Sequence, residues 1–178
     1  MQLDSITTFL ALSPNECKNI IDTASKEPLL RGEVFSSTNR QIEDQKVRAV
    51  SGTEITDDST RQFVIGLFKG TNQLELQISD IEPVQLFRYQ PGDHYNWHTD
   101  WSPNSNKKRK LSMTIQLSES SDYEGGDVEI FDGLEPRPIC RTIGHATIFP
   151  SWSLHRVRPL ISGTRWAMVA WATGKPFK

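Results

Sequence analysis

Hydrophobic and polar positions follow a helical period in the first third of the chain and a strand period beyond residue 82. Residues 13–16 read Ser-Pro-Asn-Glu, the form of a capping box with proline in the first turn. Apolar residues then recur at spacings of three and four, which predicts a helix over 14–26. The same spacing predicts a second helix over 57–72, with a strand at 45–50 between the two.

Short β-type runs separated by turn residues make up the remainder of the chain. In the run over 111–117 every odd position is apolar and every even position polar, so one face meets a core and the other faces something polar. Several such runs predict a sandwich or barrel, with the helices packed on its outside. The expected strands are 84–90, 95–100, 111–117, 128–132, 146–149, 154–159 and 166–172.

Composition fits one globular domain that spans residues 1–178. The formal net charge of -2 offers no global field to attract nucleic acid or an anionic membrane surface. Cys17 and Cys140 form no CxxC motif, so neither a disulfide framework nor a thiolate zinc site is indicated. No apolar run reaches the ~18 residues that span a bilayer, and no secretory signal is present, so we expect a soluble, cytoplasmic protein.

The four histidines of the chain include one in a metal-binding pattern, His98-Thr99-Asp100. On a strand these two side chains share a face, although the motif alone equally fits a surface pair. A further histidine, His155, lies downstream, and Arg165 opens the last predicted strand. Two histidines and one carboxylate are the ligand set of non-haem Fe(II) oxygenases. An arginine beside such a site can hold a carboxylate through two parallel hydrogen bonds.

Two other features carry weaker signals. His94 precedes His98 by four residues, but the Pro91-Gly92 turn nearby argues against a helical zinc pair. The basic run over 107–110 is expected to be a solvated loop, with attraction of an acidic peptide or product as the alternative.

Five segments occur in the order and at the spacings of a known family, namely 87–100, 111–117, 123–127, 144–150 and 155–171. Through them the second half of the chain resembles the 2-oxoglutarate- and Fe(II)-dependent dioxygenases, specifically the prolyl 4-hydroxylase-like branch. The resemblance implies an α+β, mainly β fold: a double-stranded β-helix (jelly-roll) with supporting N-terminal helices. Residues 1–80 would then form the helical support region and residues 82–174 the catalytic core.

Individual roles follow from the same resemblance, position by position. The implied iron ligands are His98, Asp100 and His155. Arg165 corresponds to the residue that binds the distal carboxylate of 2-oxoglutarate, where collagen-type and plant-type relatives have lysine. The co-substrate would also meet Tyr89, whereas Tyr95 and Trp171 match aromatic positions toward the prime substrate. Gln116 departs from the pattern, because several relatives have a tyrosine there that helps to hold 2-oxoglutarate.

The expected activity is hydroxylation of a substrate C–H bond that uses Fe(II), 2-oxoglutarate and O2, releases succinate and CO2, and has ascorbate as a candidate reductant. A peptidyl proline is the leading substrate, so a peptide or protein partner is expected. The alternatives are another protein side chain, a free amino acid, a small metabolite, or a non-catalytic jelly-roll binding module. Repair of alkylated nucleic acid is disfavoured, because that branch carries a further arginine shortly after the one matched by Arg165.

Overall fold

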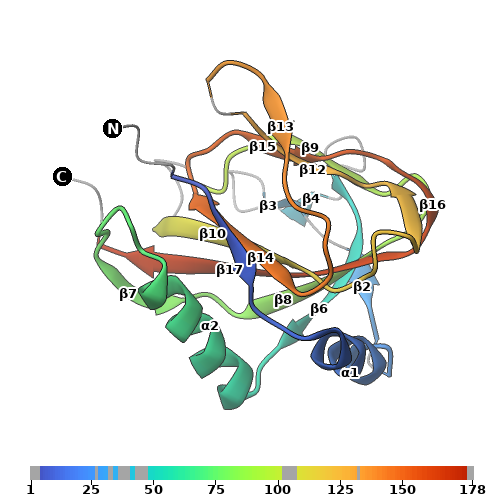
Figure 1. The fold of residues 1–178 in the computed structure, drawn as a ribbon, viewed down its shortest axis with the longest axis horizontal. Coiled ribbons are helices and arrows are strands. Elements are labelled where there is room, and N and C mark those ends of the chain that lie inside the picture. The colour runs from blue at the N-terminus through green and yellow to red at the C-terminus, as the bar shows by residue number, and fades with distance from the viewer. Residues whose placement is uncertain are drawn as a thin grey trace.

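Two antiparallel sheets face each other in the computed structural model, which describes residues 5–26, 28–31, 34–35, 41–42, 48–101, 108–131 and 133–175 (Figure 1). The larger sheet has the strand order β1-β14-β10-β17-β8-β6-β2, with β7 paired to β17. Its strands are β1 (Thr7–Leu10), β14 (His145–Pro150), β10 (Arg109–Gln116), β17 (Arg165–Gly174), β8 (Val84–Tyr89), β6 (Ser51–Ile55), β2 (Leu30–Arg31) and β7 (Ile78–Ile81).

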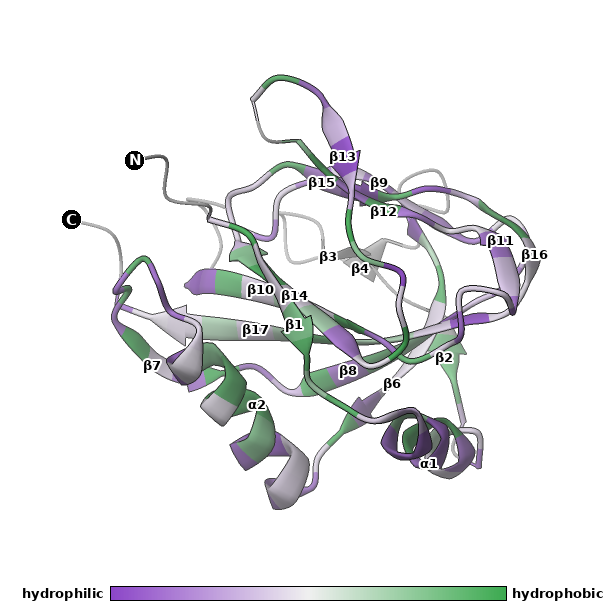
Figure 2. Cartoon of the chain, in the orientation of Figure 1, coloured by the Kyte–Doolittle hydropathy of each residue, from purple (hydrophilic) through white to green (hydrophobic). Residues whose placement is uncertain are grey.

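The smaller sheet has five strands in the order β13-β12-β15-β9-β5. They are β13 (Pro136–Pro138), β12 (Val128–Phe131), β15 (His155–Val157), β9 (His94–His98) and β5 (Arg48–Ala49). Hydrophilic residues predominate on β13, β15 and β9 of this sheet (Figure 2). Two short pairs complete the described strands: β11 (Tyr123–Gly125) with β16 (Leu160–Gly163), and β3 (Val34–Phe35) with β4 (Gln41–Ile42).

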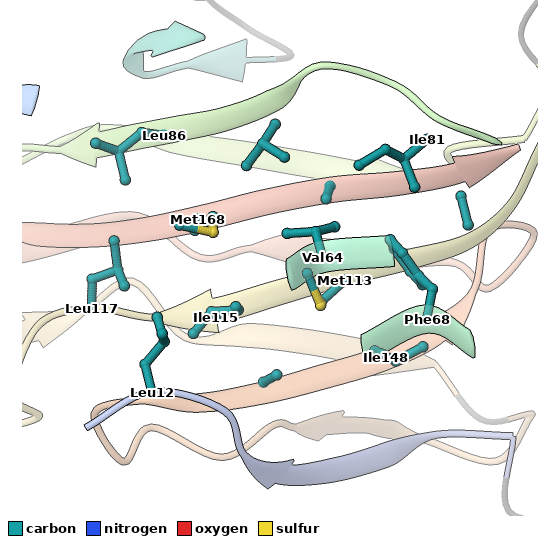
Figure 3. Close-up of a cluster of buried hydrophobic side chains, with 14 of the residues drawn as sticks. Leu12, Val64, Phe68, Ile81, Leu86, Met113, Ile115, Leu117, Ile148 and Met168 are labelled. Carbon is teal, nitrogen blue, oxygen red and sulfur yellow. The ribbon is translucent and has the colours of Figure 1, made fainter. Parts of the chain in front are cut away.

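Two helices, α1 (Pro14–Ala24) and α2 (Asp58–Gly70), lie along the outside of the larger sheet (Figure 1). Both bonds of the predicted capping box are present at Ser13 and Glu16, and Asp57 caps α2 by accepting from the Thr60 amide. The helices cover an apolar core built on the odd positions of β10, where Met113 and Ile115 are fully buried. Figure 3 shows these side chains beside Val64 and Phe68 of α2.

A second apolar cluster belongs to the inner faces of the two sheets. It consists of Val50, Phe87, Tyr89, Tyr123, Val128, Val157, Leu160 and Trp171. Between residues 111 and 117 the even positions are polar and buried, namely Ser112, Thr114 and Gln116. The alternation read from the sequence is therefore confirmed: one face of β10 packs under the helices and the other faces the smaller sheet.

The mainly β jelly-roll with supporting helices is confirmed, while several boundaries differ. The expected strand at 45–50 falls partly outside the described residues, and at Val50 the chain passes from β5 to β6, which belong to different sheets. The expected strand at 154–159 is shorter in the structure, where β15 ends at Val157. Pro159 has no amide hydrogen to donate to a neighbouring strand, so it does not extend β15. Neither β1 nor β7 was expected. Within the described chain, no helix is long and apolar enough to cross a membrane.

Candidate active site

His98, Asp100 and His155 meet on the inner face of the smaller sheet. β9 and β15 are neighbours with His98 directly opposite His155, and Asp100 follows β9 by two residues. The Nε2 atom of His98 lies 3.8 Å from Asp100 Oδ1, and that of His155 lies 3.5 Å from Oδ2. All three potential ligand atoms lie within 4.8 Å of one another, and they form the one such group in the described part of the chain. A single cation can therefore contact all three, and His94 is not among them.

Both imidazoles are oriented by backbone carbonyls. The Nδ1 atom of His98 lies 2.7 Å from the Asn96 carbonyl, and that of His155 lies 2.9 Å from the Ser153 carbonyl. A carbonyl can only accept, so each Nδ1 carries the hydrogen and each Nε2 presents its lone pair to the shared space. Burial, with the neighbouring His155, lowers the pKa of His98 to about 3, so its imidazole is neutral at physiological pH.

Asp100 is held as a buried carboxylate by groups from the larger sheet. Ser112 on β10 donates to Asp100 Oδ2 over 2.6 Å, and Nη1 of Arg109 lies 3.5 Å from Oδ1. Burial alone would raise the pKa of Asp100, but the neighbouring His155, Arg109 and His98, together with the hydrogen bond from Ser112, hold it below its ordinary value. Asp100 therefore joins the two sheets and remains ionised, which a metal ligand requires.

Arg109 is fixed by contacts on three sides. Its Nε and Nη2 donate to the two carboxylate oxygens of Glu82 at 2.8 and 2.7 Å. Its guanidinium lies 3.8 Å from the ring centroid of Trp171, while Nη1 approaches Asp100. The expectation of a solvated basic loop is wrong for Arg109 and Lys110, because both lie on β10 and Lys110 is only 4% exposed. Position 107 lies outside the described residues, and Lys108 is exposed.

Aromatic rings cover the imidazoles. Tyr95 stacks on His98 with ring centroids 3.5 Å apart and an interplanar angle of 14°. Phe149 meets His155 edge-on at 4.8 Å. These rings keep water away from the Nε2 atoms that would bind a metal. Electrostatic interactions are stronger where water is excluded.

Arg165 is the largest fully buried side chain of the described residues, at 1% exposure. Its Nε donates to Gln116 Oε1 over 3.1 Å, whereas the buried Nη1 and Nη2 atoms have no hydrogen-bond partner. An unpaired guanidinium in a protein interior is costly, so this arrangement fits a site for an anion. A carboxylate matches two such donors by geometry and by charge.

The surroundings of Arg165 are shaped to admit its side chain. Tyr89 lies opposite Arg165 across β8 and β17, with the guanidinium 5.0 Å from its ring centroid. Burial raises the pKa of Tyr89, so its hydroxyl stays protonated and able to donate. Gly126 has φ +63°, and a Cβ there would lie 2.8 Å from Leu160 and 3.3 Å from Cδ of Arg165. Gly126 therefore leaves room for Arg165.

The structure brings the residues expected from the sequence into two adjoining groups. Asp100 lies with the two histidines, and Tyr89 lies with Arg165. Tyr95 contacts the first group directly, whereas Trp171 is linked to it through Arg109. Sequence reasoning missed Arg109, Glu82, Ser112 and Ser151. For Ser112 the sequence did hold a signal, because the even positions of 111–117 are all polar and were expected to face something polar.

Comparisons with known proteins agree with this geometry. The family model of the 2OG-Fe(II) oxygenase superfamily matches residues 84–173. A PKHD-type hydroxylase of Idiomarina loihiensis is 32% identical over 133 residues, which are 75% of this chain and 57% of that protein. This chain thus spans little more than half of that relative's length.

Solved structures share the fold. A prolyl-4-hydroxylase of Pseudomonas putida superimposes with a TM-score of 0.74 at 16% identity, covering 96% of this chain and 93% of that one. A prolyl hydroxylase from Trichoplax adhaerens, in complex with a peptide fragment of the hypoxia inducible factor oxygen degradation domain, gives 0.73 at 14% identity, covering 96% and 84%.

Proposed function

The chain belongs to the 2OG-Fe(II) oxygenase superfamily, and from this premise we propose that it hydroxylates a proline in a peptide or protein. The observation that carries the proposal is the pairing of the His98, Asp100 and His155 cluster with a buried Arg165 that has two unpartnered donors. A simple binding module needs neither feature. The structural neighbours described as prolyl hydroxylases, one with a bound peptide, support the choice of substrate.

The residues present fit the iron and the 2-oxoglutarate that the family implies. Fe(II) would be held by the imidazole nitrogens of His98 and His155 and by the Asp100 carboxylate, a set that would leave positions open for co-substrate and O2. Arg165 would hold the distal carboxylate of 2-oxoglutarate, with the Tyr89 hydroxyl beside it. When bound, the metal supplies the oxidising chemistry for attack on a C–H bond.

The overall reaction balances without any other oxidant. 2-Oxoglutarate loses CO2 and gains one oxygen atom of O2 to become succinate, and the second oxygen atom becomes the new hydroxyl. The protein contributes position and environment: carbonyls orient the imidazoles, Ser112 and Arg109 orient Asp100, and the ring of Tyr95 keeps water from His98.

The test incubates the protein with Fe(II), 2-oxoglutarate, O2 and a proline-containing peptide. We expect the wild-type protein to form succinate and a peptide that carries one added oxygen. Asp100→Ala should form neither product. A peptide with alanine in place of proline should gain no oxygen. Succinate that forms with no change to any proline peptide would leave the oxygenase chemistry standing and reject the prolyl substrate. Free amino acids, other peptides and small metabolites are then the substrates to screen.

A further inference from the structure

Gln116 is the hydrogen-bond partner of Arg165 in the described structure. It lies on the polar face of β10 with 2% exposure, and its Oε1 accepts from Nε of Arg165 over 3.1 Å. The strands that carry the two residues are direct neighbours, with Gln116 opposite Ala167. The contact therefore forms within one rigid sheet rather than between mobile loops.

The backbone of Gln116 is also fixed. Its carbonyl accepts from the Gly144 amide over 2.8 Å, and the buried thiol of Cys17 on α1 lies 3.9 Å from the same oxygen. Helix α1, the turn before β14 and strand β10 thus determine where the amide of Gln116 stands. A side chain so placed can set the orientation of its partner.

A guanidinium presents two edges to a carboxylate: the side edge that includes Nε, and the end formed by Nη1 and Nη2. Gln116 occupies Nε, whereas Nη1 and Nη2 are buried and unpartnered. The end of Arg165 is therefore the edge left for an anion. The Nε bond also prevents Arg165 from turning about its long axis, so this end keeps one orientation.

We propose that Gln116 is a positioning residue that makes Arg165 bind a carboxylate end-on and thereby sets the length of 2-oxo dicarboxylate that the site accepts. This inference rests on the proposed function, since it takes the ligand of Arg165 to be the distal carboxylate of 2-oxoglutarate. In the absence of the Nε bond, the guanidinium can rotate and accept a carboxylate on its side edge. Ligands one carbon shorter or longer should then compete better.

The experiment titrates Mn(II)-loaded protein with 2-oxoglutarate, oxaloacetate and 2-oxoadipate by calorimetry, for wild type, Gln116→Leu and Gln116→Glu. The matched control is Gln85→Leu, which makes the same replacement at a half-buried position near the start of β8, a strand separated from β10 by β17. Mn(II) affinity is measured for every variant, and KM for 2-oxoglutarate and kcat are measured with Fe(II).

Gln116→Leu should lose about 10- to 100-fold in 2-oxoglutarate affinity, since a hydrogen bond to a charged group contributes roughly that factor. Its preference for 2-oxoglutarate over the two other dicarboxylates should shrink, while Mn(II) affinity and kcat at saturation stay near wild type. Gln116→Glu should lose more 2-oxoglutarate affinity, because the new carboxylate neutralises Arg165. Gln85→Leu should match wild type.

The outcomes separate the two proposals. If wild type with Mn(II) binds no 2-oxoglutarate, the proposed function fails. If wild type binds it and Gln116→Leu keeps both the affinity and the ligand preference, the positioning role alone is rejected. Should Gln116→Leu not fold, Gln116→Glu decides: 2-oxoglutarate affinity equal to wild type would overturn the inference.

Discussion

Replacing Ser112 with alanine should weaken metal binding without disturbing the fold. The Ser112 hydroxyl donates to Asp100 over 2.6 Å, and its own oxygen lies 3.0 Å from Oγ of Ser151. A carboxylate can only accept, so the Ser112 proton goes to Asp100 and Ser151 donates to Ser112. Ser151, Ser112 and Asp100 thus form a series of two hydrogen bonds that ends at Asp100, the proposed metal ligand.

The magnitude follows from burial. Ser112 is 1% exposed and the Asp100 side chain 7%, so water cannot replace the lost donor. A hydrogen bond to a charged group contributes about 1.5–3 kcal/mol. At about 1.4 kcal/mol per tenfold, this predicts a loss of about 10- to 100-fold in metal affinity. Loss of an outer hydrogen-bond partner of a metal ligand typically has an effect of the same size.

The assay is calorimetric titration with Mn(II) in the absence of co-substrate, beside urea unfolding of the metal-free protein. Ser151→Ala should show a smaller loss of affinity in the same direction. The control is Ser118→Ala, a buried serine that accepts from the Trp166 amide and so affects stability rather than the metal. Unchanged or tighter metal binding by Ser112→Ala would refute the idea that this hydroxyl preorganises Asp100.

Arg109→Met should cost about 3 kcal/mol of unfolding free energy in urea, because it removes the guanidinium that donates to both carboxylate oxygens of the largely buried Glu82. The double variant with Glu82→Leu should recover most of this loss, and no recovery would contradict the assignment. Asp57→Ala should cost about 1 kcal/mol at neutral pH through the lost cap of α2. Hydrogen bonds from the first turn lower the pKa of Asp57 to about 2, below its unfolded value, so the carboxylate stabilises fully above about pH 4. The difference from wild type should therefore narrow as the pH falls from about 4 toward 2, and a constant difference in urea unfolding across this range would contradict the shift. Gly126→Ala should cost about 1–2 kcal/mol from its positive φ and should weaken 2-oxoglutarate binding by crowding Arg165, whereas wild-type affinity in calorimetry would show that this glycine is not needed for space.

Features that depend on residues close together in the sequence could be predicted from it. His98 and Asp100 are two residues apart, the spacing that puts two side chains on one face of an extended chain, although the expected strand 95–100 ends at His98 and Asp100 lies just beyond β9. Alternation over 111–117 predicted a strand with one buried apolar face and one polar face, which the structure confirms. The capping box gave the start of α1 to the residue.

Partnerships between distant residues could not be predicted in this way. Arg109 belongs to a basic run, yet its carboxylate partner Glu82 lies 27 residues earlier. Gln116 and Arg165 are 49 residues apart and meet only because β10 and β17 pair in one register. Periodicity gives the face of a strand, but the register between strands depends on the packing of the whole sheet.

The most direct test of the central claim measures succinate released from 2-oxoglutarate with and without Fe(II), for wild type and His155→Ala. We expect Fe(II)-dependent succinate from wild type only, with iron affinity lost in the variant. Succinate formation that persists without iron, or a His155→Ala variant that retains both iron affinity and turnover, would contradict the account.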